Sequence, residues 1–212
     1  MVSSGGIVLQ HFLPEEWRAL GFDIPWSDLC RAHRTMAWIV PDSGLSLSSK
    51  LVFGWLSEHC DRLDPEDASF VRQYIPWTRV LDGTPLDFQG RTAAPVEVLT
   101  EFQASLVLKP ATSCAGQGVL VGRATPEAVW ADAVAHVGSA GTYVVQEYVQ
   151  ADELVMDFYD ASAKSVVRTP VSYVLGPYVV DDVSAGCSIR HAASSVSGVV
   201  NHSQEAGINL VL

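Results

Sequence analysis

The spacing of apolar positions along the chain changes near residue 104. Before that point apolar residues recur at helical intervals, and we predict helices over about 27–40, 46–62 and 94–103. A helix is also predicted to begin at Pro14. Another should begin at Asp64, which is a suitable N-cap because Pro65 follows it at the first helical position. Residues 75–81 change period and predict a short extended segment.

After residue 104 the apolar residues form short runs that are typical of strands. We predict these strands at 105–109, 119–121, 143–149, about 187–193, 198–201 and 208–212, and a hairpin made of 154–159 and 165–175. One helix should run from Thr125 to about Val137. The sequence therefore predicts an α+β fold with an N-terminal segment (1–25), a mainly helical part (26–104), and antiparallel sheets in two lobes (105–212).

Composition and charge exclude several classes of function. Of the 212 residues, 48% are apolar and 17% are charged, so the chain can bury a sizeable core. The net charge of −11 should repel phosphate backbones, and we predict no binding to nucleic acid. No apolar run approaches the roughly 20 residues that span a bilayer, so we predict no membrane association. The four cysteines form no CxxC or zinc pattern, which favours reduced thiols and a cytoplasmic location.

The most informative pattern is a strand, a lysine, a glycine-containing loop and a second strand. Lys109 ends an apolar run, and Gly116 and Gly118 precede the next one. Backbone N–H groups of such a loop can approach an anion closely, and the lysine adds a point charge for the same phosphates. The loop is not a Walker A or Rossmann motif, because a strand follows it instead of a helix. A glycine-rich hairpin beside a solvated lysine is the alternative interpretation.

Two later segments favour a nucleotide. The residues Gln146–Val149 end an apolar strand, where a carboxylate and main-chain groups can hold the amino group and ring edge of adenine. Arg190 ends a further strand after Gly186, and its guanidinium fork can bind phosphate.

These motifs resemble the ATP-grasp fold. The matching segments are Leu106–Pro110, Gly116-x-Gly118-Val119, Trp130 and Val145–Tyr148. Their order resembles the circularly permuted branch related to glutathionylspermidine synthetase, over roughly residues 26–212. His33-Arg34 takes the place of that branch's Asn-Lys helix, and Pro76–Arg79 matches its Pro-x-Thr segment.

The resemblance implies ATP and Mg²⁺ as cofactors and an ATP-dependent carboxylate–amine ligase as the activity. Such a ligase phosphorylates a small-molecule carboxylate, and an amine then attacks the acyl phosphate to form an amide. Arg190 is the implied catalytic residue, and the metal ligands are not assigned. The implied ATP-binding residues are Arg34, Lys109, Ser113, Gly116, Gln117, Gly118, Gln146, Glu147, Tyr148 and Val149.

One departure from the family concerns its N-terminal half, which carries the Mg²⁺ carboxylates and a catalytic arginine. That half would precede Trp26, where 25 residues stand. Either the chain is the C-terminal part of a longer protein, or another chain supplies the missing half, or the chain is a decayed nucleotide binder. We expect that this chain alone does not form amides. The alternative function is a non-catalytic domain of the same fold that binds a nucleotide or a partner protein.

Overall fold

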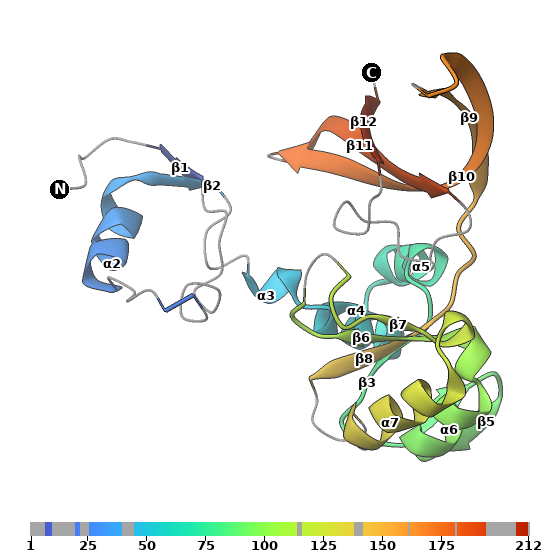
Figure 1. The fold of residues 1–212 in the computed structure, drawn as a ribbon. Helices are drawn as coiled ribbons and strands as arrows, with labels where there is room; N and C mark the ends of the chain where they lie inside the picture. Colours follow the sequence, from blue (N-terminus) through green and yellow to red (C-terminus); the bar gives the residue numbers. More distant parts are fainter. Residues whose placement is uncertain are drawn as a thin grey trace. The chain divides into compact units, whose positions relative to one another are not determined.

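The computed structural model describes most of the chain. The described residues are 7–9, 20–21, 26–39, 45–113, 116–137, 142–160, 162–180, 182–193 and 207–211. Contacts divide the chain into two compact units, 1–49 and 50–212 (Figure 1). The predicted boundary near residue 104 falls inside the second unit. The helix predicted at Pro14 and the strand predicted at 198–201 lie outside the described residues.

The first unit contains a short parallel pair of strands. Strand β1 (Ile7–Leu9) pairs with β2 (Ala37–Ile39), which follows helix α2 (Trp26–Thr35). The helix predicted over 27–40 was therefore wrong at its end, because its last residues form a strand. Trp38 and Ile39 are residue types that favour a strand once a partner strand is present. Helix α3 (Leu45–Ser48) completes the described part of this unit.

The second unit begins with helices that precede its first sheet. Helix α4 (Leu51–Glu58) is followed by the 3₁₀ turn η2 (Cys60–Arg62) and helix α5 (Pro65–Tyr74). The predicted N-cap of α5 is confirmed, since the Asp64 side chain accepts hydrogen bonds from two backbone N–H groups. The continuous helix predicted over 46–62 was wrong. It is broken at Ser49-Lys50, where the Lys50 N–H donates to the Ala111 carbonyl at 2.8 Å.

A four-stranded antiparallel sheet follows, in the order β3-β8-β6-β7. Its strands are β3 (Thr78–Val80), β8 (Tyr143–Glu147), β6 (Leu106–Pro110) and β7 (Leu120–Val121). The register places Thr78, Gln146, Val107 and Val121 in one row across the sheet. The prediction that the strand after the glycine loop pairs with the Lys109 strand is confirmed.

One face of this sheet packs on the core. It is covered by α6 (Pro95–Glu101), α7 (Glu127–Val137) and a hairpin of β4 (Leu86–Phe88) and β5 (Arg91–Ala93), as Figure 1 shows. The buried Trp130 of α7 donates from its indole N–H to the Leu99 carbonyl at 2.8 Å, which ties α7 to α6. The 3₁₀ turns η3 (Gln103–Ser105) and η4 (Gly122–Ala124) flank β6 and β7. The core leaves the opposite face of the sheet for the site described below.

A second antiparallel sheet has the order β12-β11-β10-β9. Its strands are β9 (Glu153–Asp160), β10 (Ser165–Val180), β11 (Val183–Ala193) and β12 (Gly207–Val211). The predicted hairpin around residues 160–163 is confirmed, although β10 continues beyond the predicted end at Leu175. The chain therefore has an α+β fold with antiparallel sheets. Within its described part, none of the helices is long and apolar enough to cross a lipid bilayer.

Candidate functional site

A cleft with two adjoining cavities lies over the face of the β3-β8-β6-β7 sheet that points away from the core. Their volumes are about 320 and 360 Å³, which is in the range of small-molecule sites. The first is lined by Phe53, Tyr74, Ile75, Thr78 and Val144, and the second by Val107, Val119, Val121 and Glu147–Val149. Both are also lined by Lys50, Pro76, Lys109 and Gln146, so the two cavities meet at a pair of lysines.

The alternation of side chains along two strands explains which residues face the cleft. On β6, Leu106 and Leu108 are fully buried in the core, so Val107 and Lys109 point to the opposite face. On β8, Val145 points to the core and Gln146 to the cleft. The apolar run that ends in Lys109 therefore places this amine in the cleft because of the strand period.

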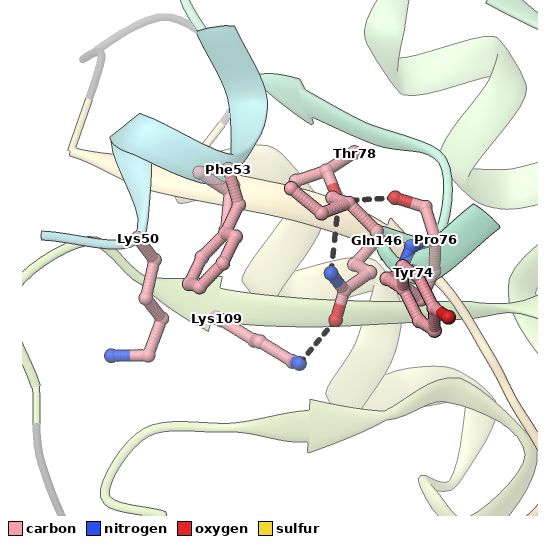
Figure 2. Close-up of a pocket in the computed structure, with 9 residues that line it drawn as sticks. Lys50, Phe53, Tyr74, Pro76, Thr78, Lys109 and Gln146 are labelled. Atoms are coloured by element: carbon pink, nitrogen blue, oxygen red, sulfur yellow. Dashed lines mark hydrogen bonds between the residues drawn. The ribbon is translucent and has the colours of Figure 1, made fainter. Parts of the chain in front are cut away.

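A directed chain of hydrogen bonds holds the Lys109 side chain. Its Nζ donates to Gln146 Oε1 at 2.5 Å, Gln146 Nε2 donates to Thr78 Oγ1 at 2.9 Å, and the Thr78 hydroxyl donates to the Pro76 carbonyl at 2.8 Å (Figure 2). Because the hydroxyl proton of Thr78 is used on Pro76, its oxygen must accept from Gln146. The amide oxygen of Gln146 is thereby turned toward Lys109.

Lys50 is the second cation of the cleft. It stands at the start of α4, and Figure 2 shows its side chain beside that of Lys109. Its Nζ donates to the Ser113 carbonyl at 2.5 Å and lies 3.5 Å from the Ser113 hydroxyl. Burial lowers the pKa of the Lys109 ammonium, and the nearby charge of Lys50 lowers that pKa further.

The loop before β7 contains a tight turn at residues 116–119. Gly116 and Gly118 have φ values of 78° and 68°, and the Val119 N–H donates to the Gly116 carbonyl at 3.2 Å. A Cβ at Gly118 would lie 2.8 Å from Pro110 Cγ, so this position needs glycine for both its conformation and its space. The turn places Val119 against the second cavity, whereas Gln117 is exposed.

The segment Gln146–Val149 is anchored to its neighbours by main-chain and side-chain contacts. The N–H groups of Glu147 and Tyr148 donate to the Trp77 and Ser105 carbonyls, each at 2.8 Å. The Arg123 guanidinium lies 3.9 Å from the centroid of the Tyr148 ring, a cation–π contact that the sequence analysis did not predict. Gln150, which follows the segment, accepts hydrogen bonds from both side chains.

Several of the predicted site residues line the cleft of the second unit. Lys109 and Gln146–Val149 line the same cleft, and Ser113 contacts Lys50 within it. Arg34 is an exposed residue of α2 in the first unit. Arg190 is half-buried on β11 in the second sheet, opposite Val174 and Ile208.

Lys50 was missed because a lysine inside a predicted helix is usually a solvated residue. A signal was present in the composition, since the chain has three lysines and ten arginines. The lysines are Lys50, Lys109 and Lys164. Two of the three line one cleft.

No group of three or more His, Cys, Asp and Glu side chains able to hold a metal ion is found among the described residues. A scan against protein-family models and a search of curated proteins both found no match to this chain. Two ammonium groups between largely apolar cavities suit an anionic ligand that also carries an apolar or planar part.

Proposed function

We propose that this cleft binds ATP, and that the chain is the ATP-binding part of an ATP-grasp carboxylate–amine ligase. One observation carries the proposal: Lys50 and Lys109 line both cavities, and Gln146–Val149 line the second one. Lys109 and the Gln146 segment also carried the sequence resemblance, whereas Lys50 did not. Lys50 replaces Arg34 in our proposal as the second ATP-binding cation.

The phosphates of ATP would be bound by the two lysines. Among the described residues, Lys109 donates to the neutral amide of Gln146, and no carboxylate pairs with its partly buried ammonium. A charge in that situation is costly, and a bound anion offsets the cost. We therefore place the phosphates over Lys109 and Lys50, next to the Ser113 loop.

The adenine ring would occupy the second cavity. Val107, Val119 and Val121 provide apolar contacts for the ring. The N–H groups of Glu147 and Tyr148 are already used, so these two residues would meet the base through acceptors, such as the Glu147 carboxylate. Acceptors suit the amino group of adenine and oppose the carbonyl oxygen of guanine, so ATP should bind more tightly than GTP.

The proposed reaction makes modest demands on the protein. A substrate carboxylate attacks the γ-phosphorus, ADP leaves, and an amine then displaces phosphate from the acyl carbon. This chemistry depends on positioning and on neutralising charge more than on a protein nucleophile. Lys50 and Lys109 would supply charge, and Mg²⁺ bound with ATP would neutralise the phosphates further.

The first test measures ATP binding to the full chain. Thermal unfolding is followed with ATP and Mg²⁺, with GTP, and without nucleotide. At 100 times its Kd, ATP should stabilise the folded chain by roughly 2.7 kcal/mol. Lys109→Met should lose this stabilisation, whereas Lys164→Met in the β9–β10 turn should retain it. No shift of the wild-type chain at millimolar ATP would contradict the proposal.

The second test separates a ligase from the alternative non-catalytic domain. ADP release is measured with panels of carboxylates and of amino acids and polyamines. Acceptor-dependent release well above background would identify a complete ligase. ATP binding without release fits an ATP-binding part that needs another segment or chain, or the non-catalytic domain. Ligase activity that appears when a partner chain is added would identify an ATP-binding part and exclude the non-catalytic domain.

A further inference from the structure

The distribution of lysines points to a property of the cleft other than nucleotide binding. Elsewhere the chain uses arginine for positive charge, with Lys164 as the one lysine outside the cleft. Arginine binds phosphate well but stays protonated, whereas a lysine can lose its proton and act as a nucleophile. Lys50 and Lys109 line both cavities, so a bound molecule can reach either amine.

Lys109 has the surroundings of a nucleophilic amine. It is half-buried, its hydrogen-bond partner is the neutral oxygen of Gln146, and Lys50 is the nearest cation in the cleft. Burial and the Lys50 charge lower its pKa, so more of its amine is neutral at neutral pH than in an exposed lysine. A neutral amine can donate one N–H to Gln146 and keep its lone pair available.

We propose that Lys109 is a site of acylation by small acyl phosphates, with Lys50 binding the phosphate group of the incoming molecule. The neutral Lys109 nitrogen attacks the carbonyl carbon and forms an amide bond. The bond from that carbon to the phosphate oxygen breaks, and inorganic phosphate leaves with the electron pair. The amine proton passes to phosphate or water. The inference rests on the anion site of the proposed function and does not require ligase turnover.

The consequence is a switch on nucleotide binding. Acylation converts an ammonium into a neutral amide, which removes one of the two lysine charges from the cleft and fills part of the space where the cavities meet. The acylated chain should bind ATP more weakly than the unmodified chain. Occupancy by ATP should in turn protect Lys109 from acylation, because both ligands need the same cations.

The experiment treats the full chain with acetyl phosphate and measures acetyl occupancy at each lysine by peptide mass spectrometry. Lys164 is exposed and serves as the internal reference. We expect Lys109 to be acetylated at least about tenfold faster than Lys164, which is ~1.4 kcal/mol in activation free energy. Acetic anhydride, which has no phosphate group, should give a smaller ratio of Lys109 to Lys164. Inorganic phosphate should compete with acetyl phosphate at Lys109.

Two variants sharpen the test. Lys50→Ala should slow the acetylation of Lys109 and leave that of Lys164 unchanged, and Lys109→Arg should abolish the fast phase. Equal rates at Lys109 and Lys164, or the same ratio with both reagents, would overturn the inference. If ATP stabilises the chain while acetyl phosphate does not label Lys109 selectively, the inference fails and the proposed function stands. If acetyl phosphate labels Lys109 selectively while ATP does not bind, the inference stands and the proposed function fails.

Discussion

Lys109 is expected to lower the stability of the fold that it serves. Its ammonium is partly desolvated beside a neutral amide and near Lys50. The charged form of Lys109 therefore has a higher free energy in the folded chain than in the unfolded chain. Lys109→Met removes the charge but keeps most of the apolar stem. We predict that this variant has a free energy of unfolding equal to or above that of the wild type, measured by urea denaturation, while its stabilisation by ATP is lost. A large loss of stability would show that the ammonium is structural.

The lowered pKa of Lys109 also predicts a pH dependence. Between the lowered pKa and the ordinary value of about 10.4, the unfolded chain binds more protons than the folded chain, so stability without ligand should rise with pH. ATP binding needs the protonated amine, and affinity should fall as pH rises through the lowered pKa. Lys50, Tyr74, Glu147 and Tyr148 are the other titratable groups that line the cavities.

Two variants at this site check the origin of the pH dependence by titration calorimetry. Gln146→Glu places a carboxylate beside Lys109, which should raise its pKa and move the loss of affinity to higher pH. Lys109→Arg keeps the charge at all accessible pH values, so the fall in affinity should disappear. An unchanged profile in Lys109→Arg would assign the dependence to another group.

Single residues of the site could be predicted where a strand fixes their direction. Lys109 and Gln146 end apolar runs, and the period of two determines that they share a face once the strands pair. Lys50 could not be placed in this way, because its position depends on a break between two helices and on a long-range hydrogen bond to Ala111. Arg123 could not be linked to Tyr148 either, since their contact depends on how η4 and the end of β8 meet.

At the scale of elements, the strands after residue 104 were predicted well and the short elements before it poorly. The β4–β5 hairpin was missed because its turn is Gln89-Gly90, with φ values of 50° and 79°, instead of the commoner Asn-Gly. The end of the helix predicted over 27–40 was wrong because pairing with β1 outweighs local propensity. The strand at the end of the predicted helix therefore depends on a partner that is distant in sequence, which local patterns do not reveal.

The connection between β7 and α7 gives a prediction at this scale. A Cβ at Gly122 would lie 1.8 Å from the Gln103 carbonyl oxygen, so Gly122→Ala must displace backbone where η3 and η4 meet. We predict a loss of several kcal/mol in unfolding free energy, measured by urea denaturation. Gly90→Ala is the matched comparison, because Gly90 has a φ of 79° but open space around its Cα. It should cost only about 1 kcal/mol. Equal losses would contradict the steric argument.

For the whole molecule, the division between residues 49 and 50 predicts which part suffices for binding. All the described residues that line the two cavities lie between Lys50 and Val149, and the unit from Lys50 onward is compact by itself. A chain of residues 45–212 should therefore fold cooperatively and bind ATP with the affinity of the full chain, as judged by calorimetry. A loss of more than about tenfold in affinity would show that the first unit contributes to the site.

The segment Gln146–Val149 also lies where the chain passes from one sheet to the next. All strands of the first sheet precede it or include it, and all strands of the second sheet follow it, beginning at Glu153. The chain therefore passes from one sheet to the other once, along the wall of the cleft. A ligand bound to this wall would therefore contact the connection between the two sheets as well as the first sheet itself.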